Sequence, residues 1–228
     1  NWDCVWECEK DAAGNVYIIG GVMPLQLLKY NAAGALQWTY NTPYDTTEWL
    51  GTFATNNAGN SFVSNGAHAK IQSISTTGAL VWDNPSPGGL FGGTEFWNIS
   101  FNCDQTKLVI GGTELPFGTA INPEPWIFDV NMTNGNIISS VQVTPPPSGF
   151  GEGHEVRSIT ACGNNKYYYM THDTLGFINS NLTSCGGAGN SNVKYGSGFN
   201  LSYKCENYRY NNSGIQALKS YDDFIFVH

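Results

Sequence analysis

The chain has 228 residues, of which 12% are charged and 14% aromatic, with 27 glycines, 10 prolines and a formal net charge of −8. No cluster of lysine and arginine is present that could neutralise a phosphate backbone, so nucleic acid is not expected as a partner. No apolar run approaches the ~20 residues that a membrane helix needs, and direct membrane insertion is not expected either.

The same composition predicts an all-β fold. No window keeps apolar residues at helical spacing without a Gly, Pro or Asn that interrupts it. Many glycines and prolines, together with β-branched and aromatic residues, are typical of short strands joined by tight turns.

The first two elements of a repeating unit form a predicted hairpin. An acidic residue opens each innermost strand, and these strands are predicted at residues 3–6, 48–51, 95–98 and 155–158. Turns rich in residues that tolerate left-handed backbone follow at 11–15, 57–60, 104–107 and 163–166. The second strands are rich in β-branched and aromatic residues, and they are predicted at 16–21, 61–66, 108–112 and 167–171.

The last two strands of the unit enclose an element that occurs twice. Third strands are predicted at 27–30, 69–74, 126–129 and 176–179. The segment NAAGALQW, residues 31–38, then recurs as STTGALVW, residues 75–82, 44 residues later. Gly34 and Gly78 supply the positive φ of the turn, and Trp38 and Trp82 are large enough to pack on the adjacent sheet. The repeat is therefore a four-stranded antiparallel meander.

A period in the middle forties with four strands predicts a β-propeller, because radial stacking buries both faces of each sheet. The predicted blades are residues 1–43, 44–90, 91–148, 149–210 and an incomplete 211–228. Since propellers close with about 4–8 blades, the chain is expected to be part of a larger ring, with seven blades in the preferred interpretation. A five-bladed ring completed by another chain is the alternative.

The segments LLKYNAAGALQW and IQSISTTGALVW resemble the propeller repeats of secreted bacterial surface proteins. They share the Gly-to-Trp spacing of the tryptophan-docking repeat in pyrroloquinoline-quinone-type propellers. The two segments are also similar to repeats in the large Bacteroidetes surface and gliding-associated proteins that are exported by type IX secretion. The resemblance covers residues 1–140, and the Asp-box of sialidases fits less well. It implies a secreted or cell-surface location, with other domains or copies of the same large protein as partners.

Six cysteines also favour an oxidising, extracytoplasmic location. Cys185 and Cys205 flank a loop and form the preferred disulfide pair, and Cys103 with Cys162 is a second candidate pair. The alternative is that all six cysteines are free buried thiols.

A candidate binding site lies where the innermost strands begin. Clustered at one mouth of the channel, the four acidic residues could hold a calcium ion, although each could equally lie on a separate solvated loop. Aromatic residues near the same edge could bind a sugar or a peptide, or could pack between blades. The candidate residues are Asp3, Glu48, Glu95, Glu155, Trp49 and Trp97.

No motif for nucleophilic, nucleotide or metal chemistry occurs in the sequence, and a quinone cofactor is not expected because no basic set would hold its carboxylates. The sequence therefore favours a non-enzymatic propeller module of a larger bacterial adhesin, filament or gliding-type protein. A propeller glycosidase or polysaccharide lyase using Glu48, Glu95 and Glu155, or a lectin, is the alternative.

Overall fold

The strands of the chain form four four-stranded antiparallel sheets and one two-stranded sheet. The computed structural model describes residues 5–21, 24–43, 52–64, 69–87, 94–102, 104–114, 124–143, 156, 158–162, 166–170, 175–182, 191–193, 218–221 and 224–227. Blade 1 comprises β1 (Val5–Lys10), β2 (Val16–Gly20), β3 (Gln26–Tyr30) and β4 (Leu36–Asn41). Blade 2 comprises β5 (Thr52–Thr55), β6 (Ser61–Ser64), β7 (Ile71–Ile74) and β8 (Leu80–Asn84).

The remaining blades continue the same pattern. Blade 3 comprises β9 (Glu95–Phe101), β10 (Leu108–Glu114), β11 (Glu124–Val130) and β12 (Ile137–Gln142). Blade 4 comprises β13 (Ser158–Cys162), β14 (Lys166–Met170), β15 (Leu175–Asn179) and β16 (Ser191–Val193). Blade 5 is the hairpin of β17 (Leu218–Tyr221) and β18 (Phe224–Val227).

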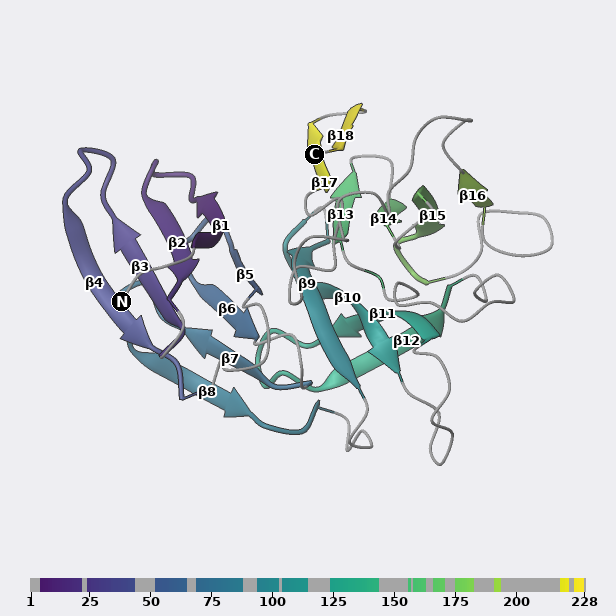
Figure 1. The fold of residues 1–228 in the computed structure, drawn as a ribbon, viewed down its shortest axis with the longest axis horizontal. Helices are drawn as coiled ribbons and strands as arrows, with labels where there is room; N and C mark the ends of the chain where they lie inside the picture. Colours follow the sequence, from purple (N-terminus) through teal and green to yellow (C-terminus); the bar gives the residue numbers. More distant parts are fainter. Residues whose placement is uncertain are drawn as a thin grey trace.

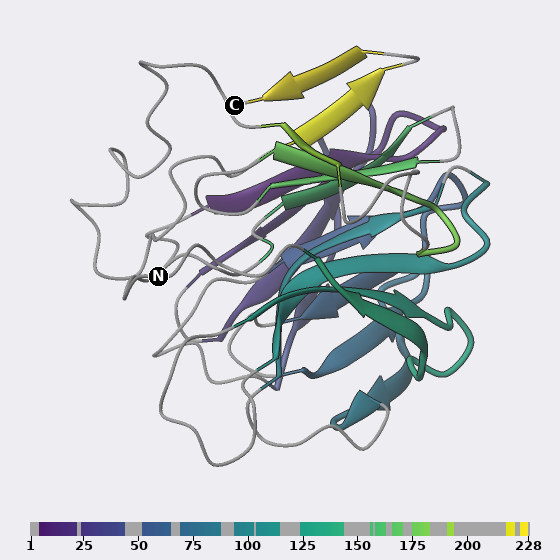
Figure 2. The same ribbon diagram turned by 90° about the vertical axis from the view of Figure 1, so that its right-hand side faces the viewer.

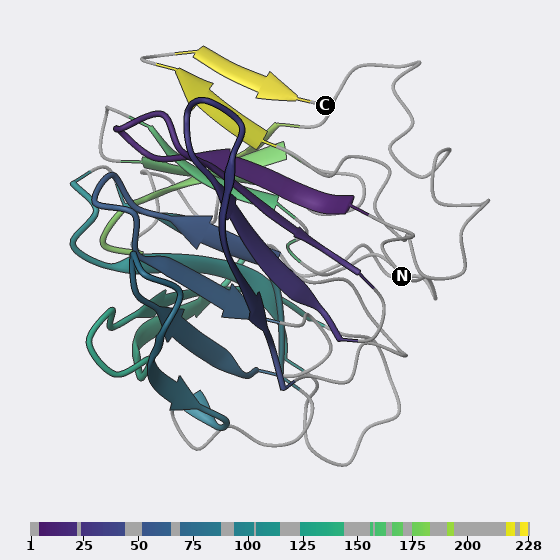
Figure 3. The same ribbon diagram turned by 90° about the vertical axis from the view of Figure 1, so that its left-hand side faces the viewer.

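The sheets are arranged around a common axis, with the first strand of each sheet innermost. Successive first strands contact one another, β1 with β5, β5 with β9, β9 with β13 and β13 with β17. Figure 1 shows the sheets along an arc that has blade 1 and the β17–β18 hairpin at its ends, and the side views show that hairpin at the upper edge of the molecule (Figures 2 and 3). The predicted all-β propeller is confirmed.

The core is divided into three apolar clusters, and each cluster lies between two successive blades. Tyr17, Ile19 and Leu27 of blade 1 pack against Phe53 and Val63 of blade 2. The second cluster joins blades 2 and 3, and the third joins blades 3 and 4. A propeller blade is buried on both faces only when a neighbour covers each of them.

The repeated Gly and Trp residues meet across these seams. Trp38 of blade 1 donates its Nε1 proton to the Thr76 carbonyl of blade 2 at 3.0 Å. A Cβ at Gly78 would lie only 2.8 Å from the ring of Trp38. Trp82 of blade 2 repeats the arrangement, because its ring would lie 2.6 Å from a Cβ at Gly135 of blade 3. The tryptophan of one blade therefore packs on the turn glycine of the next.

The seam between blades 3 and 4 uses charge in place of an indole. Ser139 pairs with Asp129, in the register where Trp38 pairs with Lys29 and Trp82 with Ser73. The buried Asp129 accepts a hydrogen bond from Lys107. Lys107 also donates to the Ser180 carbonyl of blade 4 at 3.1 Å. A lysine thus takes the place of the tryptophan N–H at this seam.

One detail differs from the sequence prediction. Gly112 was expected to end its strand, but it lies inside β10 beside an irregularity in the pairing with β9. A Cβ at Gly112 would meet the Glu95 carbonyl oxygen, so close approach of two backbones requires this glycine. Residues 48–51, 155 and 157 of the predicted inner strands of blades 2 and 4 lie outside the described part of the chain.

Candidate functional site

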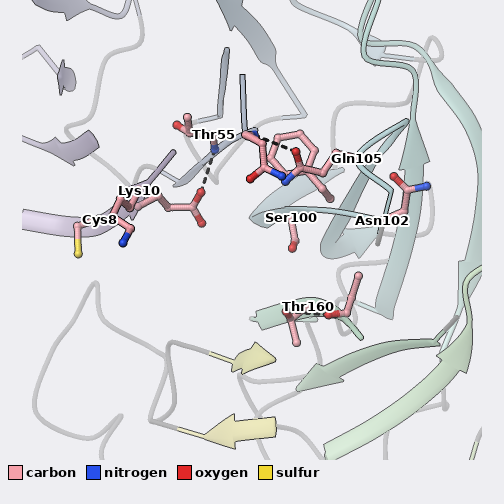
Figure 4. Close-up of a pocket in the computed structure, with 11 residues that line it drawn as sticks. Cys8, Lys10, Thr55, Ser100, Asn102, Gln105 and Thr160 are labelled. Carbon is pink, nitrogen blue, oxygen red and sulfur yellow. Dashed lines mark hydrogen bonds between the residues drawn. The ribbon is translucent and has the colours of Figure 1, made fainter. Parts of the chain in front are cut away.

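A pocket of about 450 Å³ opens at one end of the central axis (Figure 4). It is formed where the first strands of blades 1 to 4 end and where the first turns of blades 2 and 3 begin. Its lining residues are Cys8, Glu9, Lys10, Thr55, Asn57, Ser100, Phe101, Asn102, Gln105, Thr160 and Ala161. Most of these side chains are amides or hydroxyls, so the pocket offers hydrogen-bonding groups from four different sheets.

The first turn of blade 3 is held in shape by Asn102. Its Oδ1 atom accepts hydrogen bonds from the backbone N–H groups of Thr106 and Lys107, both at 2.9 Å. This turn places Gln105 at a φ of 55°, which is uncommon for a residue other than glycine. The Gln105 side chain then accepts a hydrogen bond from the Asn57 backbone N–H at 2.8 Å. The wall of the pocket is thereby fixed across two blades.

The acidic residues of β1 bind blade 1 to blade 2. Glu9 accepts a hydrogen bond from the Thr55 backbone N–H at 2.9 Å. Glu7 accepts one from the Phe53 backbone N–H at 3.3 Å. Glu9 is the single carboxylate among the residues that line the pocket, and its neighbour Lys10 is the single base.

Below the pocket, Asp11 and Tyr17 form a buried polar pair at the first seam. The Tyr17 hydroxyl lies 3.0 Å from Asp11 Oδ2 and 3.2 Å from the Gly59 carbonyl of blade 2. Burial acts to raise the pKa of Asp11, but hydrogen bonds from Asn15 and Tyr17 outweigh it and hold that pKa below its ordinary value. Burial raises the pKa of Tyr17, and Asp11 raises it further. The pair therefore stays as a carboxylate and a neutral phenol at neutral pH.

The ion pair at the third seam behaves differently. Burial raises the pKa of Asp129 above its ordinary value, while Lys107 acts in the opposite direction. Because the Asp129 side chain is only 2% exposed, it depends on Lys107 to remain charged. This cluster lies away from the lining of the pocket and holds two blades together.

Most of the acidic and aromatic residues predicted as a site lie outside the described part of the chain. These are Asp3, Glu48, Trp49 and Glu155. Glu95 and Trp97 are described, and the Trp97 N–H donates to Glu95 Oε2 at 2.9 Å. Trp97 is only 7% exposed, so its ring packs in the interior and offers no open platform to a ligand.

Glu95 and the pocket lie at opposite ends of β9. Glu95 begins β9, whereas Phe101 ends it and lines the pocket, a separation of about 20 Å by strand rise. Sequence reasoning missed the pocket because its residues come from hairpin turns, each of which has an ordinary turn composition. The signal available was that successive first turns must converge in a propeller.

The predicted disulfide pairs also fall largely outside the described residues. Cys103, Cys185 and Cys205 are not described, and Cys162 is placed only as the last residue of β13. Cys8 is an exposed free thiol. Within the described ranges, no three His, Cys, Asp or Glu side chains are grouped so as to hold a metal ion. The part of the chain that is described also has no helix long and apolar enough to cross a membrane.

Comparisons with known proteins support the fold. No protein-family model and no curated protein matches the sequence. Among solved structures, BamB from Moraxella catarrhalis is similar with a TM-score of 0.52 and 16% identity, over 78% of this chain and 51% of BamB. Quinohemoprotein alcohol dehydrogenase from Comamonas testosteroni has a TM-score of 0.56 and 14% identity, over 84% of this chain and 35% of that enzyme.

Virginiamycin B lyase from Staphylococcus aureus is a third similar structure, with a TM-score of 0.53 and 13% identity over 98% of this chain and 76% of the lyase. At these identities the likeness concerns the fold alone. The chain spans about half the length of BamB and about a third of the dehydrogenase. The chain is thus a β-propeller module, and its activity must be argued from its own residues.

Proposed function

We propose that the chain is a non-enzymatic propeller module of a larger extracellular or cell-surface bacterial protein, of the adhesin, filament or gliding type, and that it acts as a rigid binding unit. The observation that carries the proposal is the pocket at the end of the axis. Its walls come from four blades, and backbone hydrogen bonds to Glu9 and Gln105 fix them in place. A preorganised wall lowers the entropic cost of binding a ligand.

The chemistry of the pocket favours a neutral, hydrogen-bonding ligand such as a glycan or an exposed peptide segment. Ser100 and Thr160 offer hydroxyl groups. The Phe101 ring is only 8% exposed and packs in the apolar cluster between blades 2 and 3, so the lining offers hydrogen bonds and no aromatic face. Protein sites orient their ligands with a few precisely placed polar groups. Lys10 and Glu9 balance each other in charge, so the lining selects strongly for neither anions nor cations.

The alternative is a propeller glycosidase or polysaccharide lyase, and virginiamycin B lyase illustrates that a similar fold can belong to an enzyme. Hydrolysis of a glycosidic bond usually needs two carboxyl groups about 5–10 Å apart. Of the described residues that line this pocket, one is a carboxylate, Glu9, and it already accepts a backbone hydrogen bond. Binding without turnover therefore fits the pocket better than hydrolysis.

A labelled form of the protein should be screened against glycan and peptide arrays, and hits should be measured by calorimetry. Ser100→Trp places a large side chain in the pocket and should weaken binding about tenfold or more, a cost of ~1.4 kcal/mol. Val81→Trp, at a 60% exposed position of β8, is the matched control and should bind normally. New reducing ends from hydrolysis, or new unsaturated ends from elimination, in a polysaccharide hit that Glu9→Gln abolishes would replace this proposal with the enzymatic alternative.

A further inference from the structure

Among the described sheets, blade 2 covers one face of blade 1, and no other sheet covers the second face. Tyr17, Ile19 and Leu27 point into the seam with blade 2. Because side chains alternate along a strand, Ile18 and Tyr30 point to the other side. Cys8 lies directly opposite Ile18 in the sheet and shares that face. This second face, defined here by Cys8, Ile18, Leu28 and Tyr30, is called the outer face of blade 1.

The internal repeat identifies what the outer face corresponds to in the other blades. Register places Ile18 at the position of Val63 in blade 2 and of Ile110 in blade 3. Both of those residues are fully buried by the preceding blade. Tyr30 likewise corresponds to the fully buried Ile74. In blade 1, Ile18 and Tyr30 are only partly buried, whereas Leu28 between them is 9% exposed. Among the described residues, this face therefore has the composition of a seam between blades but is covered only in part.

The turn glycine of blade 1 shows the same difference. A Cβ at Gly78 or Gly135 would collide with a tryptophan of the preceding blade, whereas a Cβ at Gly34 would meet nothing within 4 Å. The backbone is the same, since φ is 81° at Gly34 and 82° at Gly78. The Ala32 carbonyl, which corresponds to the indole-bound carbonyl of Thr76, receives no donor from the described residues. Among the described residues, no side chain packs on Gly34 at the position where an indole packs on Gly78 and Gly135.

We propose that the outer face of blade 1 binds a further four-stranded blade of the same polypeptide, encoded outside residues 1–228, whose fourth strand seats a tryptophan on Gly34. This inference rests on the proposed function only in assuming a larger protein. A second copy of residues 1–228 could not supply this tryptophan. Its fourth-strand indoles, Trp38 and Trp82, already pack on the following blade of their own chain, and the sequence contains no tryptophan after Trp126.

The test compares positions that the repeat makes equivalent, in the complete polypeptide encoded by the reading frame that contains residues 1–228. Ile18→Lys should lower Tm there as much as Val63→Lys, because both lysines would be buried at a seam. In residues 1–228 alone, Ile18→Lys should be as mild as the control Val81→Lys, whose native side chain is 60% exposed. A mild effect of Ile18→Lys in the complete polypeptide would overturn the proposal.

A second measurement on the unsubstituted protein covers the case in which Ile18→Lys does not fold. Alkylation of Cys8, followed by mass spectrometry of the peptide that contains it, should be about tenfold or more slower in the complete polypeptide than in residues 1–228. Equal rates would contradict the proposal. Protection in residues 1–228 that grows with protein concentration would assign the face to a second copy instead. Failure of the ligand screen leaves each of these outcomes unchanged.

Discussion

Substituting the two equivalent turn glycines with alanine should separate the conformational cost of the turn from the cost of disturbing a seam. Gly34 and Gly78 have φ values of 81° and 82°. A Cβ at Gly78 would lie 2.8 Å from the Trp38 ring, and a Cβ at Gly34 would lie in open space. In residues 1–228, both variants therefore carry the same backbone strain, and only Gly78→Ala adds a collision.

The magnitudes follow from these two terms. Left-handed backbone costs an L-residue about 1–2 kcal/mol, which applies to both variants. Overpacking of a well-packed contact costs about 1–3 kcal/mol more, which applies to Gly78→Ala alone. We expect a loss of about 1–2 kcal/mol for Gly34→Ala and about 2–5 kcal/mol for Gly78→Ala. For a domain of this size the Tm difference between the variants should be about 2–12 °C.

Urea unfolding followed by circular dichroism measures both free energies of unfolding. The collision can be isolated by repeating Gly78→Ala in a Trp38→Ala background, where the cost should fall to that of Gly34→Ala. If the two glycine variants lose equal stability, or if the additional loss in Gly78→Ala persists without Trp38, then the Trp38 ring does not pack on Gly78.

Three further predictions concern the seams. Lys107→Met leaves the Asp129 carboxylate buried without its cation and should lower the free energy of unfolding in urea by about 3 kcal/mol. The double variant Lys107→Met with Asp129→Leu should recover more than half of that loss. Equal losses in the single and double variants would contradict the ion-pair argument. Trp82→Phe keeps a ring but loses the N–H that binds a blade 3 carbonyl, and it should cost about 1 kcal/mol, so an unchanged free energy of unfolding would refute that contribution. Because the folded-state pKa of Asp11 is lowered below 3.8, its carboxylate stabilises the fold above that pH and the contribution is lost as pH falls through the folded-state pKa. Asp11→Asn should thus flatten the dependence of stability on pH between about pH 5 and about pH 2, and an unchanged slope would show that Asp11 contributes little.

The sequence was sufficient for the repeating unit because its signals are local. The turn around Gly78 and the β-branched and aromatic content of residues 61–64 depend only on neighbouring residues, and they predicted the hairpins and the radial packing. Contacts between units were harder to predict. Nothing in the sequence near Ser139 indicates that Lys107, more than thirty residues earlier, replaces the missing tryptophan.

The binding pocket could not be predicted for a related reason. Asn57 and Gln105 have no special signature, and they meet only because two hairpins end on the same side of the axis. Attention to conspicuous acidic and aromatic residues pointed instead to the other end of the strands, where the described pair, Glu95 and Trp97, satisfy each other. Side chains that define a site through convergence are visible only in three dimensions.

The division of each seam between an indole on one blade and a glycine on the next has a consequence for how such proteins grow. A duplicated blade inherits both halves of the joint, so the new copy can fit between its parent and the following blade without further change. Blade 3 has Ser139 and a charged link where blades 1 and 2 have an indole, so a copy of blade 3 would bring no indole to the turn glycine of the blade that follows it. Gene duplication should therefore spread units like blades 1 and 2, while blade 3 stays a single, position-specific piece.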